Sequence, residues 1–137
     1  MKKLTKKNNK GFSLVELIVV VLIMAIIAVA LAPQVTKWVQ NSRISSDAQN
    51  FDSVVSAIQI AGAQGDLTKA GEIVTTKGSA WAASSGSNAD TSELEAVLGE
   101  GWESKLQSKV DTYKITYTTN GTITSMVKPN ASSVSND

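Results

Sequence analysis

The sequence predicts an α+β fold in which one long N-terminal helix packs on a small antiparallel β-sheet. Two observations support this fold class. Residues 17–36 carry no charge and are almost entirely apolar, and an apolar stripe at helical spacing follows them. Near the C-terminus, two runs of β-branched and aromatic residues flank Asn120-Gly121. Asn-Gly between two such runs is the strongest short-range signal for a β-hairpin.

The first eleven residues form a short basic segment without an apolar run. Its five lysines are Lys2, Lys3, Lys6, Lys7 and Lys10. Positive charge before an apolar helix favours the cytoplasmic side of a membrane. We therefore expect a cytoplasmic N-terminus, with everything after about residue 36 outside the cytoplasm.

The apolar run is long enough to cross a membrane, since about 20 apolar residues span the hydrocarbon core as a helix. We assign residues 12–35 to this helix. Pro33 lies inside it, where proline removes one backbone donor and crowds the preceding turn. A kink or local loosening of the helix is expected there. Trp38 lies where a tryptophan at the membrane interface is expected.

The helix is predicted to continue over residues 36–62 with an amphipathic pattern. Steps of four and three residues join the apolar positions Ile44, Ala48, Phe51, Val55, Ile58 and Gly62. This spacing predicts a single apolar stripe, which we expect to pack on the hairpin. Gly62 and Gly65 provide the expected helix stop.

Residues 63–137 are predicted to form a small globular α+β head. A strand is expected at 72–76, a loop at 79–92 and a short helix at 93–98. The cap of that helix is expected to be Thr91 or Ser92, and Gly99 or Gly101 its stop.

The hairpin is placed at residues 112–128, with its turn at Asn120-Gly121 and its strands on either side. Trp81 and Trp102 are expected to anchor the core or its loops.

The composition gives no support for an enzyme, a cofactor or a metal site. The chain has no cysteine and no histidine, which removes disulfides, thiolate ligands and the commonest general base. No spacing of Ser, Lys and carboxylates suggests a catalytic set. Four clustered acids are interpreted as a solvated face: Glu93, Glu95, Glu100 and Glu103.

Glu16 is the most informative single residue, because it is an acid inside the apolar run. Placing a carboxylate in hydrocarbon costs roughly 2.5–3.5 kcal/mol, so a partner for it is expected. Cleavage after Gly11 would free an amino group on Phe12 and so provide a nearby cation. Alternatively, Ser13-x-x-Glu16 is a capping box, in which Glu16 serves only its own helix.

Residues 10–17, Lys-Gly-Phe-Ser-Leu-Val-Glu-Leu, resemble the class III signal of type IV pilins and of the related pseudopilins. The resemblance implies that a prepilin peptidase cuts between Gly11 and Phe12 and that Phe12 is then N-methylated. It also implies that Glu16 meets the Phe12 amine of a neighbouring subunit during assembly. The helix around Ala25–Pro33 would partly melt in the filament.

The resemblance further implies a structural pilin, made as a membrane precursor and polymerised into an extracellular helical filament. Its partners would be copies of itself, the peptidase and N-methyltransferase, an assembly platform protein, an ATPase and the membrane. Adhesion, twitching motility and DNA uptake are roles of such fibres. The absence of cysteines departs from the C-terminal disulfide loop of the best-known pilins.

Several alternatives remain open at the level of sequence. The chain resembles pseudopilins of type II secretion or competence systems equally at its N-terminus. A minor pilin that captures DNA or a surface would need a basic patch, but the lysines of the head are interleaved with acids. Two further interpretations remain. The apolar run could be an ordinary secretory signal cut after Ala30 or Ala32, or it could be a plain single-span anchor.

Overall fold

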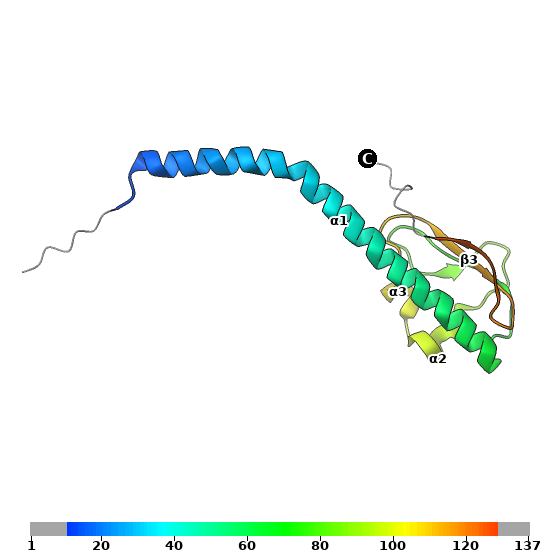
Figure 1. Ribbon diagram of the computed structural model, residues 1–137. Coiled ribbons are helices and arrows are strands. Elements are labelled where there is room, and N and C mark those ends of the chain that lie inside the picture. Colours follow the sequence, from blue (N-terminus) through cyan, green and yellow to red (C-terminus); the bar gives the residue numbers. More distant parts are fainter. Residues whose placement is uncertain (1–10, 129–137) are drawn as a thin grey trace, which may run out of the picture. The chain divides into compact units, whose positions relative to one another are not determined.

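The computed structural model describes residues 11–128 of the 137-residue chain (Figure 1). The described residues form two compact units that meet between Lys37 and Trp38. We call residues 11–37 the N-terminal segment and residues 38–128 the head. Helix α1, Leu14–Gln64, belongs to both.

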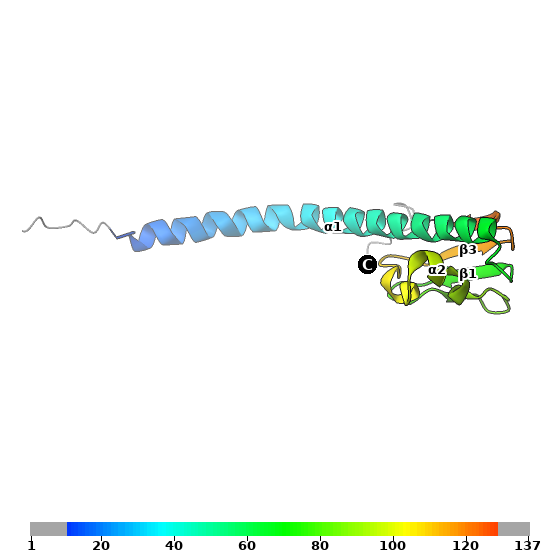
Figure 2. The same ribbon diagram turned by 90° about the horizontal axis from the view of Figure 1, so that it is seen from below.

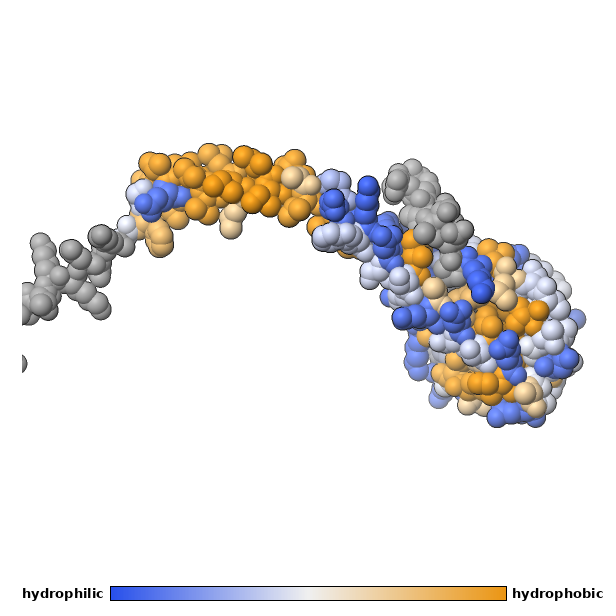
Figure 3. Space-filling view, in the orientation of Figure 1, coloured by the Kyte–Doolittle hydropathy of each residue, from blue (hydrophilic) through white to orange (hydrophobic). Residues whose placement is uncertain are grey.

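The N-terminal segment consists of the first half of α1 and the three residues before it. Its helix follows from the run of Leu, Ile, Val, Met and Ala, which holds no glycine and no turn residue up to Pro33. None of its side chains is buried, and large apolar groups cover its surface (Figure 3). This part of α1 has the length and composition of a membrane-spanning helix, and none of the residues in its most apolar stretch is buried.

The second half of α1 ends at the predicted glycine, Gly65. The Gly65 φ angle is +80°, which glycine adopts without steric cost. The Asp66 N–H donates to the Ala61 carbonyl at 2.9 Å, and the Gly65 N–H donates to the Gly62 carbonyl at 3.3 Å. This pair of bonds is a Schellman cap, which satisfies carbonyls that the helix end leaves open.

Four antiparallel strands form the sheet of the head, in the order β2-β1-β3-β4. They are β1 Gly71–Thr75, β2 Ala82–Ala83, β3 Tyr113–Tyr117 and β4 Ile123–Val127. The strand expected at 72–76 and the hairpin are therefore confirmed, with β1 one residue earlier. The prediction of a loop over 79–92 was wrong at β2, whose two residues are held by pairing with Ile73 and Val74.

The hairpin turn differs from the two-residue Asn-Gly loop that the sequence suggests. Residues 118–122 connect Tyr117 to its partner Ile123, with a register shift at Tyr117. The Gly121 N–H donates to the Thr118 carbonyl at 2.9 Å. A two-residue type I′ loop needs positive φ at both central residues, whereas only Gly121 has it here.

The core lies between the second half of α1 and the sheet, as Figure 2 shows from below. β3 alternates buried and half-buried residues, so Tyr113, Ile115 and Tyr117 all face the helix. Phe51 lies against Trp81 and Tyr113 with ring centroids 6.3 and 6.2 Å apart. The α+β fold, a long N-terminal helix packed on a small antiparallel sheet, is confirmed.

The buried stripe of α1 is rotated from the predicted one. It consists of Asp47, Phe51, Val54, Ala57, Ile58 and Ala61. Phe51 and Ile58 belong to both stripes, whereas Ile44, Ala48, Val55 and Gly62 are only half-buried. The small Ala57 and Ala61 let the backbone of α1 approach the sheet, which moves the centre of the contact.

The segment between the strands contains three short helical turns. A 3₁₀ turn, η1 Thr91–Leu94, is followed by α2 Glu95–Leu98 and α3 Trp102–Lys105. The helix expected at 93–98 is thus the end of the 3₁₀ turn η1 followed directly by the short α-helix α2. The prediction of Thr91 or Ser92 as the cap was wrong. The cap is Asp90, whose carboxylate accepts a hydrogen bond from the Ser92 N–H at 3.1 Å.

Both predicted tryptophan anchors lie in the core. Trp81 and Trp102 are buried, and their indole N–H groups donate to the carbonyls of Leu106 and Thr91. The Trp81 bond ties the connecting segment to the residue before β2, and the Trp102 bond joins α3 to η1 within that segment. Glu93 departs from the expected solvated face, because it is half-buried and accepts hydrogen bonds from the Thr68 backbone and side chain.

Candidate functional site

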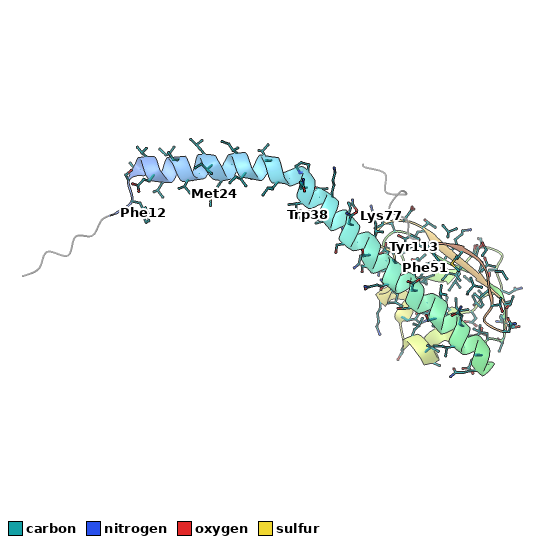
Figure 4. The ribbon with its side chains drawn as sticks, in the orientation of Figure 1. Phe12, Met24, Trp38, Phe51, Lys77 and Tyr113 are labelled. Atoms are coloured by element: carbon teal, nitrogen blue, oxygen red, sulfur yellow. The ribbon has the colours of Figure 1, made fainter. Side chains whose placement is uncertain are left out.

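The candidate site is the N-terminus of α1, where Gly11, Phe12 and Ser13 precede the first helical residue without regular structure. All three are exposed, and Phe12 has 83% of its surface accessible (Figure 4). A Cβ added to Gly11 would meet no atom within 4 Å. The described fold therefore does not itself require glycine at position 11.

Ser13 is the cap of α1. The Glu16 N–H donates to the Ser13 side-chain oxygen at 3.3 Å, and the Leu17 N–H donates to the Ser13 carbonyl at 3.3 Å. A serine before a long apolar run caps a helix in this way because its oxygen satisfies one of the open N–H groups.

Only half of the predicted capping box is formed. Among residues 11–128, the Glu16 carboxylate accepts no hydrogen bond and joins no ion pair. The backbone N–H of Glu16 thus serves the cap, while its carboxylate stays exposed and available. A negative charge in the first turn also complements the positive end of the helix dipole.

An apolar groove runs beside Glu16 on the surface of the N-terminal segment. Its lining consists of Leu14, Leu17, Ile18, Val21 and Leu22. In the described chain nothing covers these side chains, and Leu14, for example, is 79% exposed. Apolar surface of this extent needs a lipid or protein environment.

Pro33 lies inside α1, and the helix is assigned through it. Because proline has no N–H, the carbonyl of Val29, four residues earlier, has no helical donor. One turn further on, the Thr36 hydroxyl donates to the Ala32 carbonyl at 3.0 Å. The kink or melting expected at Pro33 stays a prediction.

This arrangement places Gly11 and Phe12 just before α1 and Glu16 in its first turn, while Pro33 lies about five turns away. An amino group freed on Phe12 would lie beside the helix cap and one turn from Glu16. A cation at that end opposes the helix dipole, so a carboxylate nearby would favour it. Residues 11–128 hold no cluster of acids able to bind a metal ion.

The head contains a second carboxylate site, at Asp47, that the sequence analysis missed. Asp47 is only 1% exposed and accepts hydrogen bonds from the Lys109 and Val110 N–H groups at 2.9 and 3.0 Å. The Tyr113 hydroxyl donates to it at 2.9 Å and the Ser108 hydroxyl at 3.2 Å. Burial, together with the bond to Asp47, raises the pKa of Tyr113 to about 12.

The Asp47 site is structural, since its donors all come from the loop before β3 and from β3 itself. It fastens that loop to α1. A signal for it was present in the sequence: Asp47 is three residues after Ile44 and four before Phe51, so it lies on the apolar stripe. A charged residue there requires buried partners.

Comparison with known proteins identifies the N-terminal site. Residues 6–32 match the prokaryotic N-terminal methylation motif. The class III signal resemblance is therefore confirmed, and this motif together with the apolar helix fits a membrane-anchored precursor. No curated protein and no solved structure matches the chain.

Proposed function

We propose that this chain is the precursor of a structural subunit of a type IV pilus. It is cleaved after Gly11, N-methylated at Phe12 and polymerised through the apolar half of α1. The observation that carries this proposal is the exposed apolar helix, which bears one acid with no partner among residues 11–128. The methylation motif at residues 6–32 supports it independently.

The proposed assembly starts from a subunit held in the cytoplasmic membrane by α1, with its N-terminus inside and its head outside. An assembly platform protein and an ATPase move it into a helical filament, where neighbouring apolar helices replace lipid. Glu16 pairs with the Phe12 amine of the next subunit and sets the register. Loosening of the helix around Pro33 accommodates the packing.

A pseudopilin of a type II secretion or competence system is the second candidate, because it uses the same N-terminal site. A minor pilin that binds DNA or surfaces is the third. The absence of cysteines does not separate them. Abundance in long surface filaments favours the pilin, and confinement to the cell envelope favours the pseudopilin.

The deciding experiment is the intact mass and N-terminal sequence of the protein in sheared cell-surface material. We expect a chain that begins at N-methylated Phe12. A chain beginning after Ala30 or Ala32 would overturn the proposal in favour of an ordinary secreted domain. An uncut chain found only in the membrane would leave a plain anchor.

A Gly11→Val variant sharpens the test, because the described fold has open space at this position. We expect it to accumulate uncut in the membrane while its head unfolds at the same denaturant concentration as the wild type. If the variant were cut and assembled as usual, Gly11 would not be the residue that the peptidase reads.

A further inference from the structure

One end of the head brings together the part of α1 around Asp47, the last residues of β1 and β4, and the first residue of β3. The Tyr113 hydroxyl, at the start of β3, bonds to Asp47 on α1. Thr75, the last residue of β1, pairs with Tyr113, and Val127, the last residue of β4, pairs with Lys114. This end is the one at which α1 enters the head from Trp38.

Four exposed cations flank these positions, and we call them the basic collar: Arg43, Lys77, Lys109 and Lys128. Arg43 is one helical turn before Asp47, and the Lys109 amine donates to the Ser46 hydroxyl at 2.9 Å. Lys77 follows β1, and Figure 4 shows it beside Tyr113. Lys128 directly follows β4.

The basic collar has little negative charge beside it. Asp47 is buried and saturated with donors, and Asp111 is half-buried and accepts from the Thr112 N–H. The two ion pairs among residues 11–128 are Lys69–Asp90 and Lys114–Glu72, so neither uses a collar residue.

Acids gather instead around the far end of the head. Asp66 follows the end of α1, and Glu93 accepts from Thr68 close by in the chain. Asp90 pairs with Lys69 in the same region. Three acids therefore lie at the end opposite the basic collar, but Lys69 lies among them and Lys114 pairs with Glu72 in the sheet, so the charges of the head are only partly separated.

Along the chain, the end of the head with the basic collar is the end that follows the apolar segment. The uncharged residues 17–36 are followed by Lys37 and then by Trp38, which is 63% exposed, as an interfacial tryptophan would be. Arg43 follows Thr36 by seven residues, or about 10 Å along a helix. That distance ends just beyond the headgroup layer, which adds roughly 5–8 Å on each side of the hydrocarbon core, so the long arginine side chain has to reach back towards the phosphates.

We propose that the basic collar binds the phosphate groups of anionic lipids while the subunit is held in the membrane. This inference rests on the proposed function, which places α1 in the membrane and the head outside it. Each cation near an anionic surface strengthens binding by about fivefold. The collar would hold the head against the membrane until assembly removes the subunit.

The test uses the full precursor reconstituted into phosphatidylcholine vesicles with or without phosphatidylglycerol. Because the chain has no cysteine, a single spin label can be attached at Ser79→Cys, near the collar, or at Thr119→Cys, in the hairpin turn. A nickel chelate on lipid headgroups reports how close each label lies to the membrane. We expect phosphatidylglycerol to bring the Ser79 label closer and to leave the Thr119 label unchanged.

Two matched double variants identify the residues responsible. Lys77→Gln with Lys128→Gln removes two collar cations, and Lys69→Gln with Lys105→Gln removes two cations that are not collar residues. We expect the collar variant to weaken the phosphatidylglycerol-bound state on the order of 20-fold and the control to leave it unchanged. High salt should weaken the phosphatidylglycerol-bound state of the wild type in the same way, because it screens the charges.

Equal relaxation of the Ser79 label with and without phosphatidylglycerol would overturn the proposal. So would a collar variant that behaves as its control does. If lipid composition had no effect but the collar variant lost binding to a short DNA duplex in detergent, the surface would be one for nucleic acid. None of these outcomes depends on cleavage at Gly11, which tests the proposed function. The lipid-binding proposal and the proposed function can therefore fail independently.

Discussion

Glu16 and Asp47 are two carboxylates on the same helix, and their surroundings assign them opposite tasks. Asp47 is buried, and four donors of the head surround it. Glu16 is exposed among apolar side chains, and only its backbone is engaged. The fold therefore uses the charge of Asp47 for its own stability and leaves that of Glu16 without a partner among residues 11–128.

Glu16→Gln and Ser13→Ala separate assembly from capping. Glu16→Gln removes the charge but keeps the N–H that bonds to Ser13, so we expect a subunit that is cut after Gly11 yet absent from sheared filaments. Ser13→Ala removes the cap, which costs about 1 kcal/mol of helix stability, and should still assemble. Immunoblots of the sheared fraction measure both. Filament loss in Ser13→Ala and not in Glu16→Gln would show that capping is the task of this turn.

Asp47→Ala should strongly destabilise the head. It leaves the N–H groups of Lys109 and Val110 and the hydroxyl of Tyr113 without their acceptor, and each buried unsatisfied group costs about 1–3 kcal/mol. We expect a loss of at least about 3 kcal/mol in urea unfolding followed by tryptophan fluorescence. Tyr113→Phe removes a single donor and should cost less. A loss smaller than that of Tyr113→Phe would mean that Asp47 does not hold the loop.

Two buried tyrosines make the head sensitive to alkali. Burial, with the charge of Glu93, raises the pKa of Tyr117 to about 12, and the pKa of Tyr113 is raised similarly. Their ordinary pKa is about 10, so the folded state holds these protons more tightly. Their contribution to stability is complete below about pH 10 and is lost as the pH rises towards 12.

Tyr117→Phe tests this dependence, because the Tyr117 hydroxyl is buried without a hydrogen-bond partner in the described chain. The variant should be as stable as the wild type or more stable at pH 8. Between about pH 10 and 12 its unfolding free energy should fall less steeply. An unchanged slope in urea titrations across this range would exclude Tyr117 as the source.

At the scale of elements, two glycines decide how closely α1 approaches the hairpin turn. A Cβ on Gly62 would lie 2.1 Å from the Gly121 nitrogen, so the helix and the turn touch backbone to backbone. Gly121 itself has φ +78° and would direct a Cβ to 2.7 Å from the Ile58 carbonyl oxygen. The turn therefore fits against the helix only while both positions lack side chains.

Gly62→Ala should force the helix and the turn apart. Overpacking typically costs about 1–3 kcal/mol, and here the obstacle is rigid backbone, so we expect the upper part of that range. Gly65→Ala is the comparison, because its surroundings are open and only its positive φ is strained. Hydrogen exchange should show faster exchange at residues 118–122 in Gly62→Ala alone. Equal exchange in the two variants would argue against the contact.

The elements predicted correctly from sequence are those whose signal is local. Repeated apolar spacing gave α1, and β-branched runs gave the hairpin. The sequence missed β2, because its two alanines are a strand only through pairing with β1. It also missed α3, a single turn too short to show a period. The turn around Asn120 was assigned the wrong form, since contact with Gly62 and the register shift depend on distant residues.

The same distinction holds for the candidate site. Gly11, Phe12 and Glu16 could be proposed from the sequence because they belong to one short motif, and the match at residues 6–32 covers that motif. Their individual roles stay predictions. Asp47 was missed because its donors lie more than 60 residues away along the chain. The basic collar could not be predicted from the sequence for a related reason. Only the strand register brings Lys77 and Lys128 to one end of the head.

At the scale of the whole molecule, the buried core and the exposed apolar helix occupy different stretches of the chain. Every buried side chain among residues 11–128 lies at position 47 or beyond. The N-terminal segment contributes none of them. The core of the head is therefore complete without the apolar half of α1, as the proposed assembly requires.

We accordingly expect a polypeptide of residues 38–137 to fold and to stay monomeric without detergent. It keeps Asp47, Phe51 and both core tryptophans, so near-ultraviolet circular dichroism and the urea midpoint should match those of the head in the full chain. The full chain should need detergent or lipid, because its first helix exposes apolar side chains such as Leu14 and Val29. Size exclusion and urea unfolding of both proteins make the comparison. A truncated head that is unfolded, or less stable by several kcal/mol, would mean that the N-terminal segment takes part in folding as well as in assembly.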